Sequence, residues 1–233
     1  MASCDELGRR FAEAYSGKWR EEAVNLDDPE SYRVITSVPV AVLAKRSSEA
    51  KVREVFSSSN PWEELSSGKL RWSFANPLDS SSGTLVLGWA LWGFAQTTQS
   101  PSDLTGLSNK AGFKNFLSKL KRTGFVDAPE GSKSHIEAFV SGILDADCVL
   151  NYASSLESAA ASNPDYVLIY PSRTVFARHV FSVFNSGSET EQEGAKDFLR
   201  YLASNYPKMS VPSGVSTLSI PKYYPGLNNA ELA

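Results

Sequence analysis

The sequence has few of the residues from which metal and redox sites are built. Its 233 residues include only two cysteines, Cys4 and Cys148, and two histidines, His135 and His179. The members of each pair are far apart and match no metal-ligand spacing, so we expect neither a metal nor another cofactor. Whether Cys4 and Cys148 pair is not decided by the sequence, whereas the apolar neighbours of Cys148 predict a small buried side chain.

The sequence also lacks a strong charge of one sign and a long apolar run. The formal net charge of -3 offers no electrostatic basis for binding nucleic acid or an anionic membrane. The most apolar window, residues 85–95, is shorter than the roughly 18 residues that a membrane-spanning helix needs. The N-terminal letters MASCDELGRRF show no apolar segment typical of a secretory signal. We therefore expect a globular chain that does not act on nucleic acid.

Two common catalytic motifs are missing from the Ser-rich segment DSSSGT, residues 79–84. It has no Lys of the kind that a nucleotide-phosphate loop carries. It also lacks the first glycine of the Gly-x-Ser-x-Gly turn found in many serine hydrolases. We expect a protein that is not an enzyme, and we keep a hydrolase that uses a serine of residues 80–82 as the weakest of three hypotheses.

The same segment stands at the centre of the most informative stretch of the chain, residues 71–96. Alternating apolar residues up to Phe74 predict a short strand, and Asn76-Pro77 ends it. After the Ser-rich turn, residues 85–94 are apolar almost all round, which is typical of a buried helix. A helix N-terminus preceded by small hydroxyl residues suits an anion or a polar ligand. The alternative is that these serines cap the helix and do nothing more.

The remaining periodic segments alternate between the two kinds of secondary structure, which predicts an α/β fold with a mainly parallel sheet. Ligands of such folds gather at the carboxyl ends of strands, where the Ser-rich turn is expected to lie. We predict strands at residues 33–45 (interrupted near Pro39), 148–152, 166–170 and 181–184, and helices at 5–24, 47–56, 60–65, 110–122, 135–144, 154–161 and 190–205.

Six segments, in this order, resemble the bacterial extracellular solute-binding proteins that serve ABC transporters. They are VITSVPVAVLA (34–44), NPWEEL (60–65), GKLRWSFANPLDSSSGTLVLGWAL (68–91), DADCVLNYASSL (145–156), YVLIYPSRTVFARHVFSVF (166–184) and ETEQEGAKDFLRYL (189–202). The family similarly shows a hinge strand with a Ser-Pro-like pair, a Ser-rich turn that opens a helix, and a strand that ends in Tyr. The likeness covers residues 33–205.

This resemblance implies a periplasmic-binding-protein-like (type II) fold, a three-layer α/β/α arrangement. Residues 33–205 would form the solute-binding-protein-like domain, and residues 206–233 a proline-containing tail. The family opens with a first lobe of about a hundred residues. Here residues 1–32 would hold an N-terminal helix and a remnant of that lobe, so the resemblance implies that most of the N-terminal lobe is lacking. The compartment it implies is periplasmic or extracellular.

The resemblance also implies a site and partners. Ser80, Ser81, Ser82, Gly83 and Thr84 would face a small polar or anionic solute through hydroxyl and backbone N–H groups. Closure of two lobes over the solute would be detected by a membrane permease or a sensor. Further candidates for the ligand-binding site are Tyr152, Tyr170 and Ser37.

Each of these further candidates has an alternative interpretation, which for Ser37 is a turn at the end of a strand. A tyrosine at a strand end commonly buries its ring and keeps only its hydroxyl in water. Trp89 and Trp92, three positions apart on an apolar helix, are expected in the core rather than in a stacking site.

A second hypothesis for the whole chain is a domain without a pocket that binds another protein or forms a homo-oligomer.

Overall fold

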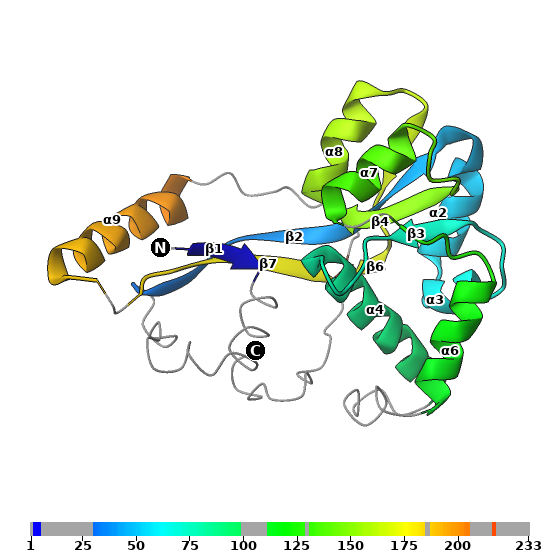
Figure 1. Ribbon diagram of the computed structural model, residues 1–233, viewed down its shortest axis with the longest axis horizontal. Coiled ribbons are helices and arrows are strands. Elements are labelled where there is room, and N and C mark those ends of the chain that lie inside the picture. Colours follow the sequence, from blue (N-terminus) through cyan, green and yellow to red (C-terminus); the bar gives the residue numbers. More distant parts are fainter. Residues whose placement is uncertain are drawn as a thin grey trace. The chain divides into compact units, whose positions relative to one another are not determined.

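The computed structural model describes residues 2–5, 30–98, 111–128, 131–184, 187–205 and 216–217 (Figure 1). The helices in these ranges are α2 (Glu49–Ser57), α3 (Pro61–Leu65), α4 (Ser81–Thr97), α6 (Ala111–Arg122), α7 (Ser132–Val140), α8 (Ala153–Ser162) and α9 (Glu189–Asn205), with a short 3-10 turn at Arg46–Ser48. The strands are β1 (Ala2–Asp5), β2 (Tyr32–Lys45), β3 (Trp72–Phe74), β4 (Cys148–Tyr152), β5 (Tyr166–Ile169), β6 (Arg173–Thr174), β7 (Phe176–Ser182) and β8 (Ser216–Thr217). Within the described part of the chain, no helix is both long and apolar enough to span a membrane.

The chain divides into two compact units. Unit 1 comprises residues 1–38 and 177–210, and unit 2 comprises residues 39–176 and 211–233. The first passage between them falls within β2, at the bond between Val38 and Pro39. The sequence predicts a break in the strand at this proline, but β2 runs through it as one strand of 14 residues. Pro39 therefore marks a crossing between units, one of the alternatives to an interior ladder position that proline allows.

The sheet of unit 2 is mainly parallel, with one strand reversed. β3 pairs in parallel with β4, and Phe125 extends the parallel arrangement by a bridge to Trp72 of β3. β2 pairs antiparallel with β4 on one side and with β5 on the other, so β4 and β5 run in the same direction. The predicted mainly parallel sheet is thus confirmed, whereas the reversed β2 between two parallel strands was not foreseen.

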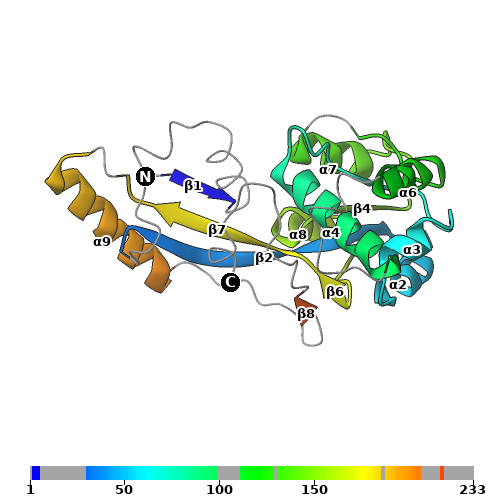
Figure 2. The same ribbon diagram turned by 90° about the horizontal axis from the view of Figure 1, so that it is seen from below.

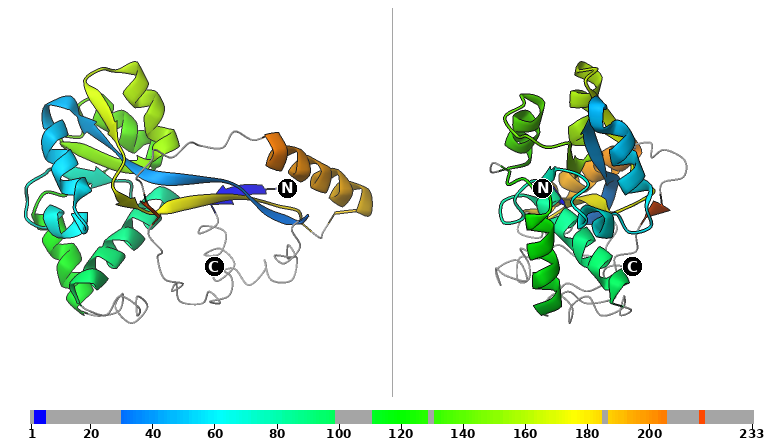
Figure 3. Two further views of the ribbon diagram at one scale, coloured as in Figure 1. Left: turned by 180° about the vertical axis from the view of Figure 1, so that it is seen from behind. Right: turned by 90° about the vertical axis from the view of Figure 1, so that its right-hand side faces the viewer.

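Helices cover both faces of this sheet, which agrees with the predicted α/β class. Every residue of β4 is buried, as expected of a strand that has elements packed on both sides. In the right-hand view of Figure 3, α2 in light blue and α7 in green lie on opposite sides of the strands. α7, α8 and α4 all contact β4.

A cluster of tryptophans forms the core beside β3 and α4. Trp62, Trp72 and Trp89 are almost completely buried, and Trp62 meets each of the other two edge-on with ring centroids 5.5 Å apart. Edge-on pairs of this kind are favourable because of the ring quadrupole. α6 lies beside α4 (Figure 2), where Phe94 contacts Phe113 and Phe116. The core role expected for Trp89 and Trp92 is confirmed, with Trp92 7% exposed, and Trp62 and Trp72 belong to the same core.

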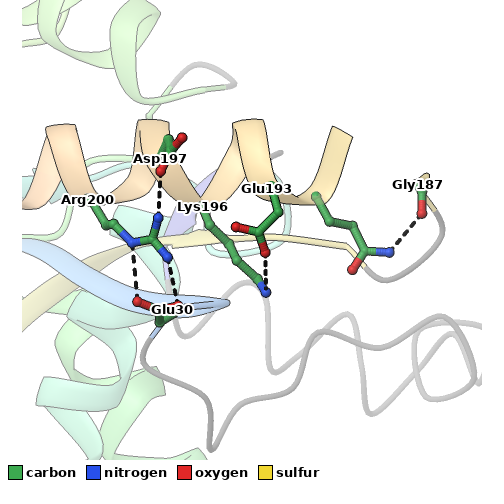
Figure 4. Close-up of polar contacts among 7 residues, drawn as sticks. Glu30, Gly187, Glu193, Lys196, Asp197 and Arg200 are labelled. Atoms are coloured by element: carbon green, nitrogen blue, oxygen red, sulfur yellow. Dashed lines mark hydrogen bonds and ion pairs between the residues drawn. The ribbon is translucent and has the colours of Figure 1, made fainter. Parts of the chain in front are cut away.

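The described residues of unit 1 form a small sheet with one helix, α9. β1 pairs antiparallel with β7, and its apolar cluster is formed by Ile35, Val183 and Leu199 of α9. Ion pairs on α9 are exposed: Arg200 contacts both Glu30 and Asp197 (Figure 4). The helix predicted at residues 190–205 is confirmed. Most of the helix predicted at residues 5–24, and the tail apart from β8, lie outside the described residues.

Candidate ligand-binding site

Two strands of the unit 2 sheet and one bridge segment precede helices that begin at one edge of the sheet. β3 leads into α4, and β4 leads directly into α8, which begins at Ala153. The bridge segment at Phe125 precedes α7 in the chain. Because these strands are parallel, their carboxyl ends lie at the same edge. The N-termini of α4, α7 and α8 follow from this edge. The first N–H groups of a helix have no acceptor within the helix, and its N-terminus is the positive end of the helix dipole.

The first turn of α4 starts where the sequence predicts a capped helix. Ser80 is the N-cap, and its Oγ accepts a hydrogen bond from the Gly83 N–H at 3.3 Å. A Cβ atom on Gly83 would lie 2.1 Å from the carbonyl oxygen of Ala75. Gly83 is therefore required by the close approach of α4 to the backbone that follows β3, a packing reason that is independent of any ligand.

A serine that the sequence analysis did not single out completes a cluster of hydroxyls. Ser132, the first residue of α7, lies with its Oγ 2.5 Å from that of Ser80 and 2.8 Å from that of Ser82. Ser80 and Ser82 are themselves 2.9 Å apart, so each hydroxyl contacts the other two. We call Ser80, Ser82 and Ser132 the hydroxyl cluster. The sequence signal that was missed is Gly131-Ser132, a glycine followed by a hydroxyl residue where a helix can start. In the structure, Gly131 has a positive φ and is the N-cap of α7.

Ser81 and Thr84 point elsewhere. The exposed Ser81 accepts a hydrogen bond from the hydroxyl of Tyr152 at 3.1 Å, which joins the start of α4 to the end of β4. The Thr84 hydroxyl donates to the carbonyl of Pro77 at 2.8 Å and so secures the turn before the helix. Of the predicted site residues, the structure therefore brings together Ser80, Ser81, Ser82, Gly83, Thr84 and Tyr152.

Tyr170 and Ser37 are not joined to this group by any contact we observe. The Tyr170 hydroxyl donates to Glu157 of α8 at 3.3 Å, and burial together with that carboxylate raises the Tyr170 pKa. Ser37 belongs to unit 1, whereas the hydroxyl cluster belongs to unit 2. Their contact with a ligand stays a prediction.

The surroundings of the cluster give little support to acid–base chemistry. The side-chain partners of Ser80, Ser81 and Ser82 are other hydroxyls, from Ser132 and Tyr152, in the part of the chain that the structure describes. No group of three or more His, Cys, Asp or Glu residues suited to a metal occurs among the described residues. The arrangement offers hydroxyl and N–H donors for a hydrogen-bond acceptor.

Similar folds are found among solved structures. The sulfate-binding protein SubI from Mycobacterium tuberculosis H37Rv is 13% identical, with a TM-score of 0.52 over 78% of this chain and 56% of that chain. An ABC transporter protein from Clostridium perfringens ATCC 13124 is 12% identical, with a TM-score of 0.55 over 86% and 62%. The periplasmic binding protein MotA from A. tumefaciens B6, in complex with glucopine, is 10% identical, with a TM-score of 0.56 over 86% and 61%.

The chain has the periplasmic-binding-protein-like (type II) fold. It spans between half and two thirds of the length of these similar structures. No family model and no curated protein sequence matches it. At such low identity the likeness shows the fold alone, and the resemblance first seen in the sequence is confirmed at that level.

Proposed function

We propose that the chain binds a small polar or anionic solute at the edge where α4, α7 and α8 begin, as the substrate-binding component of an importer does. The observation that carries this proposal is the convergence of the Ser-rich starts of α4 and α7 and the Tyr-ended β4 at one edge of a parallel sheet. The similar structures support it, because their names describe binding and transport proteins. Binding of a solute without a chemical reaction would agree with these names.

The hydrogen bonds point to an acceptor-rich solute. The three hydroxyls of the cluster can satisfy one another, since each contributes one proton to three mutual contacts. Ser81 is different, because Tyr152 donates to its Oγ and its own proton remains for a ligand. The first N–H groups of α4 also lack intrahelical acceptors. An oxyanion or carbonyl group would therefore be bound by the Ser81 hydroxyl and the N–H groups beside it.

A thermal-shift panel tests the proposal. The panel would contain sulfate, phosphate, carboxylates and neutral polar solutes, with diamines as a donor-only comparison. A ligand present at a hundred times its Kd stabilises the folded state by about 2.7 kcal/mol. We expect at least one acceptor-rich solute to raise the Tm and the diamines to leave it unchanged. If no solute raises the Tm, the proposal fails.

Two variants connect that shift to the site. Ser81→Ala combined with Ser82→Ala should abolish the shift, because it removes both hydroxyls from the start of α4. Ser81→Ala alone, at an exposed position, should weaken the shift without lowering the Tm of the free protein. Ser118→Ala is the matched control: Ser118 is exposed on α6 and its hydroxyl donates to Lys114 of the same helix. A shift that survives the double substitution would place binding elsewhere.

A second candidate function is association with another protein or with a second copy, and one observation on α9 favours it. Phe198 and Tyr201 are 48% and 61% exposed, and their rings stack with centroids 6.5 Å apart. Exposed aromatic pairs are enriched at interfaces. Light scattering of the wild type and of a Phe198→Ser, Tyr201→Ser variant separates the two functions. A stable dimer that the variant loses, together with no ligand from the panel, would favour association.

A further inference from the structure

α7 is held by polar side chains at both ends. At its start, Ser132 contacts the hydroxyls of Ser80 and Ser82, and the side chain of Asn151 donates to the Ser132 carbonyl at 3.5 Å. At its end, the hydroxyl of Tyr166 lies 3.2 Å from the carbonyls of Phe139 and Val140. Between these ends, a buried histidine joins α7 to β3 by a further polar contact.

His135 is completely buried, and its Nε2 lies 3.2 Å from the Oγ of Ser73 on β3. The Ser73 hydroxyl donates its only proton to the carbonyl of Val126 at 2.7 Å. The bond between Nε2 and Ser73 must then be donated by the imidazole. The ring is therefore the Nε2–H tautomer, and its Nδ1, which has no hydrogen-bond partner among the described residues, is unprotonated.

We propose that His135 is a positioning residue for the candidate site: its bond to Ser73 fixes the rotation of the first turn of α7 and hence the place of Ser132 against Ser80 and Ser82. His135 and Ser132 are three positions apart and so are neighbours on the helix surface. β3 carries the Ser73 anchor and also leads into the turn that holds Ser80 and Ser82. β3 therefore determines the positions of Ser80 and Ser82 on one side of the hydroxyl cluster and of Ser132 on the other.

The burial of His135 supports this role. Desolvation lowers the His135 pKa from 6.5 to about 4. The ring is therefore neutral at pH 7, which keeps one nitrogen as a donor and the other as an acceptor. A histidine that only filled space could be replaced by an apolar residue without effect on α4. A positioning residue could not, since its bond directs the turn that meets α4.

The inference rests on the proposed function only in that the cluster borders the proposed solute. The test needs no ligand. Long-range proton–nitrogen NMR should show a protonated Nε2 and an unprotonated Nδ1 in His135 of the wild type. His135→Phe fills the volume without a donor, Ser73→Ala removes the acceptor by a smaller change, and His135→Gln restores a donor near the position of Nε2. Tyr166→Phe is the control, because it removes a bond at the other end of the same helix.

In His135→Phe and in Ser73→Ala, we expect the backbone NMR signals of Ser81 and Ser82 to move. The backbone amide of residue 135, which donates to the Gly131 carbonyl, should exchange its hydrogen about fivefold faster. This factor corresponds to the loss of one hydrogen bond of about 1 kcal/mol. His135→Gln should recover most of both effects, and Tyr166→Phe should leave Ser81 and Ser82 unmoved. If His135→Phe does not fold, the signals of Ser81 and Ser82 in Ser73→Ala alone test the role of His135.

A proton on Nδ1 in place of Nε2, or unmoved Ser81 and Ser82 signals in Ser73→Ala, would overturn the assignment of His135. A solute panel without a binder would instead overturn the proposed function and leave the result on His135 standing.

Discussion

α4 of unit 2 and α9 of unit 1 are helices of the same length, 17 residues each, with opposite relations to their surroundings. α4 carries no charged residue and buries ten of its positions, Trp89 among them. α9 carries six charged residues and buries only Leu199. α4 is consequently held by packing along most of its length, although Ser81 at its start is exposed, whereas α9 keeps an exposed face.

The comparison shows which contacts determine the position of α4. Gly83 places α4 against the backbone after β3, and the tryptophan cluster holds the helix body. The polar groups at the start of α4 thereby have defined positions at low conformational cost. Among the described residues, Phe198 and Tyr201 are not enclosed in this way: they are 48% and 61% exposed and contact each other on the surface of α9. We therefore expect substitutions in α4 to be costly and equivalent substitutions in α9 to be tolerated.

The largest effect is expected from aromatic truncation. Trp89→Ala should lower the free energy of unfolding by about 4 kcal/mol, because a fully buried large side chain leaves a cavity. Phe198→Ala, on the exposed face of α9, should cost about 0.5 kcal/mol or less. Urea unfolding followed by circular dichroism measures both. Equal costs would contradict the contrast between the two helices.

The second effect concerns pH and belongs to unit 2. His135 is protonated below pH 6.5 in the unfolded chain but only below about 4 in the folded one. The unfolded state therefore binds more protons between these values, and stability falls as the pH decreases from 6.5 to 4. The loss should reach about 3 kcal/mol at pH 4. Unfolding of the wild type across this range should show the loss, and His135→Gln should remove it; an identical pH profile in both proteins would disprove the assignment.

The third effect compares two helical glycines. In Gly83→Ala the new Cβ would clash with the Ala75 carbonyl, and we expect a loss of about 2 kcal/mol. In Gly194→Ala of α9 the Cβ meets nothing within 4 Å, and the better helix propensity of alanine should add about 0.5–1 kcal/mol. Thermal unfolding should show stability changes of opposite sign in the two variants, a loss for Gly83→Ala and a gain for Gly194→Ala. A stabilised Gly83→Ala variant would show that α4 does not approach β3 so closely.

The smallest effect is expected from the ion pair between Arg200 and Glu30 in unit 1. Both side chains are about half exposed, so solvent screens their attraction. Arg200→Gln should leave the free energy of unfolding almost unchanged, and any difference from the wild type should shrink when salt is added. A large difference that persists in high salt would mean that this face of α9 is more buried than the structure shows.

The sequence carried most of the fold because its local signals agreed with one another. The apolar run of α4, the serines before it and the Pro at the start of α3 each predicted an element that the structure confirms. The break in the strand predicted at Pro39 was wrong, because a proline is compatible with a continuous strand where the chain crosses between units. The reversed direction of β2 could not be foreseen, since strand pairing depends on contacts distant in sequence.

The candidate site could be predicted only in part. Ser80 to Thr84 stood out because five small or hydroxyl residues are consecutive there. Ser132 lies 50 positions from Ser82. The parallel bridge between Phe125 and Trp72, which pairs residues distant in sequence, aligns the segment that precedes α7 with β3. The role of His135 depends in the same way on Ser73, 62 positions away.

The most direct measurement of the central claim is a backbone amide NMR titration with the acceptor-rich solutes of the panel. We predict saturable changes confined to the first turns of α4, α7 and α8, with Ser81 and Ser82 moving most and α9 unmoved. If no solute moves these signals, or if the changes are centred on Phe198 and Tyr201 of α9, the edge where the three helices begin is not a binding site.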